Sequence, residues 1–373
     1  MVSPSRFYDL LIENGVSFFV GVPDSLLKDF CAYITDHVGE ENQVIAANEG
    51  NALAIATGYH LSTNKIALVY MQNSGLGNAV NPLLSLTDED VYKIPVILLI
   101  GWRGKPGESD EPQHVKQGKL TLQLLEALGI RYSVLRADDN LADKVIQDAS
   151  KYISEVGLPY AIVVEKGVFD KYESKAEKSL VYSLGREEAL KVILDSMNLI
   201  DVVVSTTGKI SREIFEYREV LKQSHSRDFL TVGSMGHSLS IALGLSMKCK
   251  NRVYCVDGDG ALIMHMGSLS IVGQKGPTNL IHIVLDNESH DSVGGQPTAS
   301  ANMDIAKIAR ACGYKNVYTI FDKKELKSKL KLIGDLSGPS FIVVKVNKGA
   351  RSDLGRPTTT PQENKKAFMS FIK

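Results

Sequence analysis

The chain has 373 residues, which exceeds one ordinary hydrophobic core and suits two domains. Its 42 lysines and arginines nearly balance its 43 aspartates and glutamates, which leaves no basic footprint for nucleic acid or a membrane surface. The longest apolar run near an expected strand, Ile94–Trp102, is far too short to span a bilayer, and the first residues do not follow a signal-peptide pattern. We therefore expect a soluble, cytoplasmic protein without nucleic-acid or membrane partners.

Short apolar runs alternate with helical patterns along the chain. The runs are rich in Val, Ile and Leu with little alternation, which is typical of parallel strands covered by helices on both faces. In chain order, strands are expected at 16–21, 66–71, 95–100, 160–165, 202–205, 253–257, 280–286 and 341–346. Helical stretches among them include 50–62, 120–128 and 186–197.

The charged segment Asp170–Ser179 lacks apolar periodicity and separates two series of such elements. A segment of this kind indicates a linker. We therefore predict an α/β fold with two doubly wound domains built on parallel sheets. The first domain is expected over 1–170, the linker over 171–184 and the second domain over 185–373.

In the second half, an apolar strand runs into Gly258-Asp259-Gly260, and the next strand ends at Asp286-Asn287. Mg²⁺ prefers roughly six oxygen ligands, and the carboxyl ends of parallel strands meet at one edge of a sheet. Asp259 and Asn287 are therefore candidate metal ligands. The two glycines let the backbone approach a diphosphate, to which the following helix presents free N–H groups. The alternative is an ordinary strand-to-helix turn.

In the first half, Glu49 opens a helical stretch rich in small residues, which permits close packing of a cofactor. The alternative is a glutamate that only stabilises the helix dipole. Asp24 follows the first expected strand, where it could face a substrate or cap a helix. Asn73 and Ser74 follow the second strand at a similar position.

Two patterns resemble the thiamine diphosphate (ThDP) enzymes. One is the order strand, Gly-Asp-Gly, helix, strand, Asn; the other is E-x2-A-x3-A-x-G-Y, beginning at Glu49. The resemblance implies a pyrimidine-binding first domain and a diphosphate-binding second domain. It implies that Glu49 hydrogen-bonds the coenzyme's aminopyrimidine ring and activates it. Mg²⁺ would be held by Asp259, Asn287 and the backbone carbonyl of Ser289. The first Asn of the family's Asn pair is Asp286 here, which could shift the local charge without abolishing the site.

The same resemblance implies further cofactor contacts. The carbonyl of Gly233 would meet the amino group of the pyrimidine, and Met235 would wedge between the two rings unless it is ordinary core packing. The other expected cofactor-binding residues are Asn73, Ser74, Thr207, Gly208, Gly258, Gly260 and Ala261.

Four strings resemble the phosphonopyruvate decarboxylase family: GVPDSLLK, GWRGKPGESDEPQHVKQG, NESHDSVGGQPT and DLGRPTTTP. The middle domain of larger ThDP enzymes is missing, which fits the compact two-domain group that also includes sulfopyruvate decarboxylases. The resemblance implies decarboxylation of 3-phosphonopyruvate to phosphonoacetaldehyde and CO₂ in phosphonate biosynthesis. It also implies a homo-oligomer with active sites at subunit interfaces.

A phosphonate dianion needs cationic or donor-rich contacts. The expected loop Gly101–Lys119 carries several candidates, of which we favour His114 and Gln117, although each could be solvated. Asp24, His114 and His290 are the further candidate catalytic groups beside Glu49.

Four alternatives stay open. Two are sulfopyruvate decarboxylase and a carboligase that passes its intermediate to a second oxo acid. A third is a non-catalytic ThDP- or nucleotide-binding regulator, which would not need Glu49. A dinucleotide-dependent oxidoreductase is disfavoured, because no G-x-G-x-x-G follows an early strand.

Overall fold

The computed structural model describes residues 1–175 and 181–373. It divides the chain into two compact units, one over Met1–Glu177 and Val293–Gln296 and the other over Lys178–Ser292 and Pro297–Lys373. The predicted linker, 171–184, includes residues 176–180, which lie outside the described residues. The domain limits at 170 and 185 stay a prediction.

The first unit is built on a six-stranded parallel sheet of order β2-β1-β3-β4-β6-β5 within the described residues. Its strands are β1 Phe18–Gly21, β2 Gln43–Ile45, β3 Ala67–Gln72, β4 Ile97–Gly101, β5 Arg131–Leu135 and β6 Tyr160–Val164. Its helices are α1 Pro4–Glu13, α2 Lys28–His37, α3 Glu49–Thr63, α4 Leu76–Pro82, α5 Pro112–Ala127 and α6 Asp139–Val156.

Helices cover both faces of this sheet. Successive residues of a strand point to opposite sides, so each strand contributes to two cores. Leu68 and Leu99 pack in one core with α1, α2 and α6. Val69 and Leu98 pack in the other core with α3, α4 and α5. Neither face of the central strands reaches water, which explains their continuous apolar sequence.

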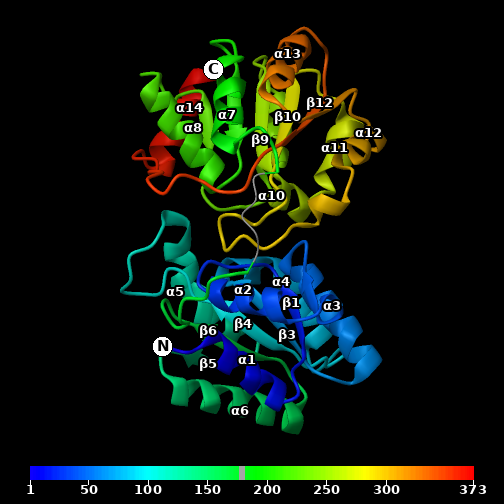
Figure 1. Cartoon of the computed structure of the whole chain (residues 1–373), viewed down its shortest axis with the longest axis vertical. Coiled ribbons are helices and arrows are strands. Elements are labelled where there is room, and N and C mark those ends of the chain that lie inside the picture. The colour runs from blue at the N-terminus through cyan, green and yellow to red at the C-terminus, as the bar shows by residue number, and fades with distance from the viewer. Residues whose placement is uncertain (176–180) are drawn as a thin grey trace. The chain divides into compact units, whose positions relative to one another are not determined.

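The second unit repeats this architecture with the order β11-β12-β10-β9-β7-β8, again six parallel strands within the described residues. The strands are β7 Val202–Ser205, β8 Asp228–Leu230, β9 Val253–Gly258, β10 Leu280–Asp286, β11 Asn316–Ile320 and β12 Ser340–Lys345. The helices are α7 Arg186–Asp195, α8 Lys209–Val220, α9 Ser238–Ser246, α10 Asp259–Met264, α11 Ser268–Lys275, α12 Ile305–Ala311, α13 Lys323–Gly334 and α14 Pro361–Phe371. In Figure 1, α7 and α8 lie on one side of this sheet, and α11 and α12 lie on the other.

The sheet order places the metal and diphosphate motif. Strands β9 and β10 are neighbours, and Gly258 pairs in register with Leu285. The segments after the two strands, Asp259 and Asp286-Asn287, therefore begin at the same carboxyl edge of the sheet. Within the described parts of the chain, no helix has the length and apolar character needed to cross a bilayer.

One expectation was wrong in its extent. The segment expected to be a loop over Gly101–Lys119 is irregular only as far as Glu111, because α5 begins at Pro112. Proline fits the first turn of a helix, where its missing N–H costs nothing. His114 and Gln117 therefore lie on a helix.

A buried ion pair fastens the edge of the second unit and yields a stability prediction. Arg218 on α8 donates to both carboxylate oxygens of Asp228 on β8, at 2.9 and 3.0 Å, and both side chains are fully buried. Asp228→Ala leaves the buried guanidinium without its carboxylate counter-ion and with only its hydrogen bond to Gln223, so we expect a loss of about 3–5 kcal/mol in unfolding free energy. Urea unfolding followed by far-ultraviolet circular dichroism measures it. Asp195→Ala, which removes only an exposed contact with Tyr217, is the control; an equal loss in both variants would contradict the expectation.

Candidate active site

Glu49 is the first residue of α3, which begins there because the Asn48 side chain accepts a hydrogen bond from the N–H of Asn51. Its carboxyl is buried, with 5% of the residue exposed. Asn78 of α4 donates to Glu49 Oε2 at 2.7 Å. A Cβ at Gly75 would lie only 2.4 Å from Glu49 Oε1, so the turn after β3 packs directly on the carboxylate. A dipole-stabilising glutamate needs neither burial nor this dedicated donor, so the geometry favours a chemical role.

Asp24 follows β1 and is fully buried. It accepts hydrogen bonds from the N–H of Leu26 at 2.9 Å and from Gln72 Nε2 at 2.7 Å. Ser74 in turn donates to Gln72 Oε1 at 2.7 Å. Burial raises the pKa of Asp24 above its ordinary value despite these donors. A carboxyl that keeps its proton more readily than a solvated one is compatible with the candidate catalytic role of Asp24, which stays a prediction.

Asn73 joins two strand ends rather than offering a free amide. Its Nδ2 donates to the Arg103 carbonyl at 2.8 Å and to Thr121 Oγ1 at 2.9 Å, and its Oδ1 accepts from the Arg103 N–H at 3.2 Å. The side chain is therefore occupied in holding the segment after β4 against the segment after β3. A direct contact of Asn73 with the cofactor stays a prediction.

His114 and Gln117 differ in their surroundings. His114 is buried, and its Nδ1 has no hydrogen-bond partner among the described residues. Burial, with a smaller effect from Arg103, lowers the pKa of His114 to about 4, so the ring is neutral at neutral pH. The side chain of Gln117 lies on the exposed face of α5. Neither residue offers a buried positive charge for a phosphonate, and both assignments stay predictions.

The low pKa of His114 predicts how the stability of the first unit depends on pH. The unfolded chain takes up this proton near the ordinary value of 6.5 and the folded chain only near 4, so the unfolded state binds more protons between these values. The contribution of the neutral His114 to the unfolding free energy is therefore fully present above pH 6.5, and it is lost as the pH drops toward 4. His114→Asn should flatten this fall. Urea unfolding followed by the fluorescence of Trp102, the single tryptophan, measures it; an unchanged pH slope in the variant would contradict the expectation.

In the second unit, Asp259 begins α10 directly after β9 and is 2% exposed. Its Oδ2 accepts from Thr298 Oγ1 at 2.5 Å and from Ser300 Oγ at 3.1 Å. The Ser300 hydroxyl also lies 2.8 Å from Asp286 Oδ1. Burial and the neighbouring Asp286 raise the pKa of Asp259 to about 6. A nearby divalent cation would stabilise the charged form of this buried carboxylate, so Asp259 fits the implied Mg²⁺.

Asn287 and Ser289 complete the predicted metal set. Both are buried, and Asn287 Oδ1 lies 3.2 Å from the Ser289 N–H, which donates to it. Glu288 between them has φ +58°, so the chain turns sharply directly after β10. The strand pairing therefore brings the three residues predicted as ligands to one edge.

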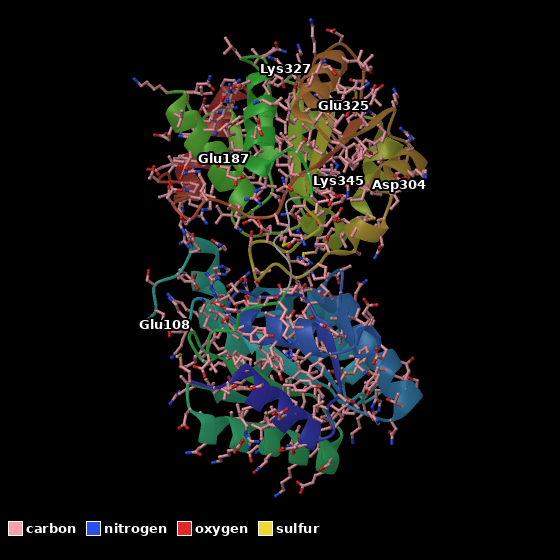
Figure 2. The ribbon with its side chains drawn as sticks, viewed as in Figure 1. Glu108, Glu187, Asp304, Glu325, Lys327 and Lys345 are labelled. Atoms are coloured by element: carbon pink, nitrogen blue, oxygen red, sulfur yellow. The ribbon has the colours of Figure 1, made fainter. Side chains whose placement is uncertain are left out.

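The departure at Asp286 has a partner that sequence reasoning missed. Lys345 of β12, labelled in Figure 2, pairs in register with Asp286 and places Nζ 2.7 Å from Asp286 Oδ2. The same Nζ lies 2.8 Å from Glu288 Oε1. Burial alone would lower the pKa of Lys345, but the hydrogen bonds to the two carboxylates raise it. The carboxylate that replaces the family's Asn is thus balanced by a lysine from the next strand.

The predicted cofactor-binding turns lie at the same carboxyl edge. Gly208 and Gly233 have φ of +94° and +75°, and Thr207 Oγ1 accepts from the Gly233 N–H at 3.0 Å. A Cβ at Gly260 would lie 3.6 Å from Met235 Cε and 3.1 Å from the His290 ring, so these three residues lie together. Burial lowers the pKa of His290 to about 4. The remaining predicted contacts are Gly258, which ends β9, and Ala261, which is buried in α10.

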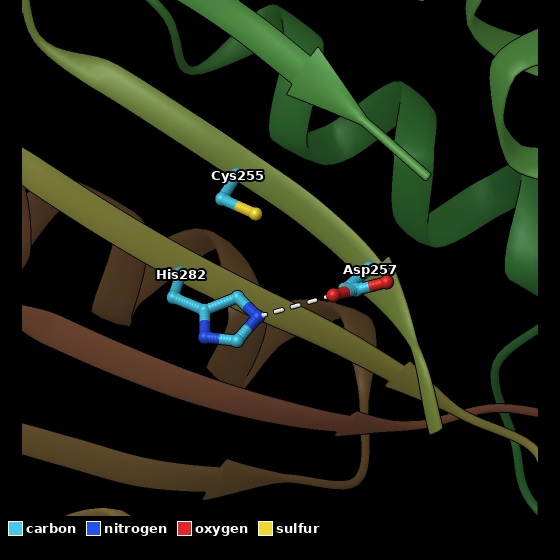
Figure 3. Close-up of side chains that lie close together, drawn as sticks. All are labelled: Cys255, Asp257 and His282. Carbon is cyan, nitrogen blue, oxygen red and sulfur yellow. Dashed lines mark ion pairs between the residues drawn. The ribbon is translucent and has the colours of Figure 1, made fainter. Parts of the chain in front are cut away.

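A buried polar cluster, also missed by sequence reasoning, consists of Cys255, Asp257 and His282 (Figure 3). Asp257 accepts from the Gly258 N–H at 3.0 Å and from Ser238 Oγ at 2.9 Å, and His282 Nε2 lies 3.7 Å from it. The Cys255 thiol lies within 4.8 Å of the ligand atoms of Asp257 and His282, and burial raises its pKa well above the ordinary value. Ser238 is the first residue of α9, which follows the Gly233 turn. Asp257 therefore links this part of the chain to Gly258 by accepting a hydrogen bond from each.

Comparison with known proteins agrees with the two-domain fold. Residues 5–127 match the family model of the thiamine pyrophosphate enzyme N-terminal binding domain, and residues 206–344 match that of the C-terminal binding domain. The chain is 33% identical over 382 residues to a phosphonopyruvate decarboxylase of Streptomyces viridochromogenes, covering 96% of this chain and 92% of that protein. It is 32% identical over 395 residues to one of Streptomyces hygroscopicus, covering 100% and 94%. Identity to a sulfopyruvate decarboxylase of Methanosarcina acetivorans is 26% over 398 residues, covering 100% and 98%.

The two domains and their matched motifs define a thiamine pyrophosphate enzyme. Within this class, the chain belongs to the family of ThDP-dependent 2-oxo acid decarboxylases that includes the phosphonopyruvate decarboxylases. The predicted fold class and the family resemblance are confirmed.

Proposed function

We propose that the protein catalyses the ThDP- and Mg²⁺-dependent decarboxylation of 3-phosphonopyruvate to phosphonoacetaldehyde and CO₂. The observation that carries the choice of substrate is the whole-length likeness to two phosphonopyruvate decarboxylases, at 33% and 32% identity, against 26% for the sulfopyruvate enzyme. The buried Glu49, with its hydrogen bond from Asn78, supports catalysis over a merely binding role, which would not need this carboxylate.

The residues of the second unit would hold the metal and the diphosphate. Asp259, Asn287 and the Ser289 carbonyl supply oxygen ligands for Mg²⁺. The glycine turns at 208, 233, 258 and 260 would let backbone N–H groups approach the phosphates, and Met235 would pack against the coenzyme. When bound, ThDP supplies the nucleophilic carbon and the electron sink that decarboxylation of a 2-oxo acid needs.

The residues of the first unit would hold and move protons. Glu49 would accept a hydrogen bond from the pyrimidine ring and so favour the coenzyme's reactive tautomer; Asn78, which donates to Glu49, holds this carboxylate in place. Exchange of a carboxylate for hydrogen in the product requires one proton. Asp24, whose pKa is raised by burial, can hold that proton near neutral pH more readily than a solvated carboxyl.

The proposed enzyme is a homo-oligomer, as its family resemblance implies. In phosphonate biosynthesis its irreversible release of CO₂ would draw an unfavourable phosphonate-forming equilibrium forward. Sedimentation velocity on the purified protein tests the association state.

Parallel assays with three oxo acids test the proposed substrate. Phosphonopyruvate, sulfopyruvate and pyruvate are each supplied with saturating ThDP and Mg²⁺, while CO₂ is measured and the products are identified by ³¹P and ¹H NMR. We expect the highest kcat/KM with phosphonopyruvate and phosphonoacetaldehyde as the product. A higher value with sulfopyruvate would favour the sulfopyruvate alternative. An added acceptor oxo acid tests for carboligation, which would appear as a coupled product in place of the free aldehyde.

A further inference from the structure

The segment between β4 and α5 holds a guanidinium fixed in one orientation. Arg103 Nε and Nη2 donate to the two carboxylate oxygens of Asp110 at 2.8 and 2.5 Å, and Nη1 donates to Ser25 Oγ at 2.7 Å. A guanidinium carries five N–H groups. Three of these groups donate the hydrogen bonds just named. The other two, one on each Nη, have no hydrogen-bond partner among residues 1–175 and 181–373. A pair of N–H groups on a fixed plane matches two oxygens of a phosphonate or sulfonate.

The segment that carries Arg103 is anchored rather than solvated. Trp102 Nε1 donates to the Gly118 carbonyl at 2.8 Å, and the Gly104 N–H donates to Asp110 Oδ2 at 2.8 Å. A Cβ at Gly118 would lie 1.8 Å from the Gly104 carbonyl, so α5 and this segment touch backbone to backbone. An arginine held in this way loses little side-chain entropy when an anion binds.

The backbone of Arg103 is also connected to the turn that packs on Glu49. Both its N–H and its carbonyl are hydrogen-bonded to the Asn73 side chain. Two residues further on, Gly75 packs against Glu49. The backbone of Arg103 and the turn that packs on Glu49 are therefore linked through Asn73 at the carboxyl edge of the first sheet.

The charges around Arg103 permit an anion. Its hydrogen bonds to Asp110 raise the pKa of Arg103, which stays protonated. The pKa of Asp110 is lowered: burial opposes this, but the hydrogen bonds from Arg103 and Gly104 outweigh it. Burial raises the pKa of Asp24, which reduces the negative charge beside Ser25. The other cation of the segment, Lys105, is already paired with Glu165 at 2.8 Å.

We infer that Arg103 is the specificity-determining residue of the substrate site: its two remaining N–H groups bind the anionic group on C3 of the oxo acid. This inference rests on the proposed function and deepens it. Ser25 and Asp110 are positioning residues, because their hydrogen bonds fix the orientation of the guanidinium plane. The site recognises a tetrahedral oxyanion, phosphonate or sulfonate, and gives no corresponding contact to the methyl group of pyruvate.

Arg103→Gln tests the inference through the ratio of two substrates. Loss of a charge-assisted hydrogen-bonded pair should lower kcat/KM for phosphonopyruvate about 10- to 100-fold, mainly through KM, and leave pyruvate turnover little changed. Arg103→Lys should recover part of the loss, because it restores the charge without the planar pair of donors. Lys119→Gln removes an exposed cation of α5 and serves as the matched control. Equal losses with both substrates would overturn the inference.

A binding measurement separates this inference from the proposed function. Calorimetric titration of the ThDP-loaded protein with phosphonoacetate, which cannot be decarboxylated as a 2-oxo acid, should show about 10- to 100-fold weaker binding to Arg103→Gln than to the unchanged chain. Unchanged binding overturns the anion site even if phosphonopyruvate is the substrate. Weakened binding without phosphonopyruvate turnover overturns the substrate instead. If Arg103→Gln fails to fold, Asp110→Asn tests the inference in its place. We expect it to lower kcat/KM for phosphonopyruvate and the affinity for phosphonoacetate by a smaller factor, with pyruvate turnover unchanged.

Discussion

Glu49→Gln is expected to lower kcat about 10²- to 10⁴-fold at saturating ThDP, which is the range that positioned acid–base groups contribute. Glutamine keeps the shape of the side chain and an oxygen that can accept from Asn78, so the fold of the first unit should be unaffected. It cannot carry the negative charge that favours the reactive tautomer of the coenzyme. Affinity for ThDP should change far less than turnover, because we propose that the second unit holds the diphosphate and the metal.

Two measurements separate these effects. Steady-state release of CO₂ gives kcat, and hydrogen–deuterium exchange at C2 of bound ThDP, followed by ¹H NMR, reports activation without substrate. Glu155→Gln, an exposed change on α6, is the matched control and should behave as the unchanged chain. Full turnover, or undiminished exchange at C2, in Glu49→Gln would refute the activation role.

Asp259→Asn is expected to have the second large effect, and it acts on binding. The change keeps the side-chain volume but removes the charge from the proposed metal set. We expect the Mg²⁺ concentration for half-maximal ThDP binding to rise at least about 100-fold, since loss of groups that only support a metal ligand already costs about 10- to 100-fold. The unliganded variant should fold, because one of the two buried carboxylates that repel each other becomes neutral.

ThDP binding to Asp259→Asn can be followed by fluorescence or calorimetry during titration with Mg²⁺. Asp304→Asn is the control, since this residue caps α12 at the surface and asparagine is an equally good cap. An unaltered Mg²⁺ requirement in Asp259→Asn would show that the metal is held elsewhere.

Burial decides which strands the sequence predicts. The eight expected strands correspond to β1, β3, β4, β6, β7, β9, β10 and β12, which occupy the interior of the two sheets. The strands that were not expected are β2, β5, β8 and β11, and each is an edge of its sheet. These edge strands are only partly buried, as in Gln43–Ile45 and Arg131–Leu135, so polar residues interrupt the apolar signal.

In the candidate site, local sequence patterns indicate some residues, and only the packing of the fold reveals others. Asp259 and Asn287 could be predicted because each directly follows a strong strand and the carboxyl ends of parallel strands meet. Lys345 could not, because its pairing with Asp286 depends on β12 lying beside β10. Asn78 and Ser300 are likewise brought to Glu49 and Asp259 by packing, and no local pattern marks them as partners.

Reconstitution of the stripped protein tests the central claim most directly. The chain is freed of cofactor and metal, and CO₂ release from phosphonopyruvate is measured with neither addition, with ThDP, with Mg²⁺ and with both. We predict turnover only when both are present, at a level that falls with Asp259→Asn and with Glu49→Gln. Turnover in the absence of ThDP, or none with both additions for phosphonopyruvate, sulfopyruvate and pyruvate alike, would contradict the account.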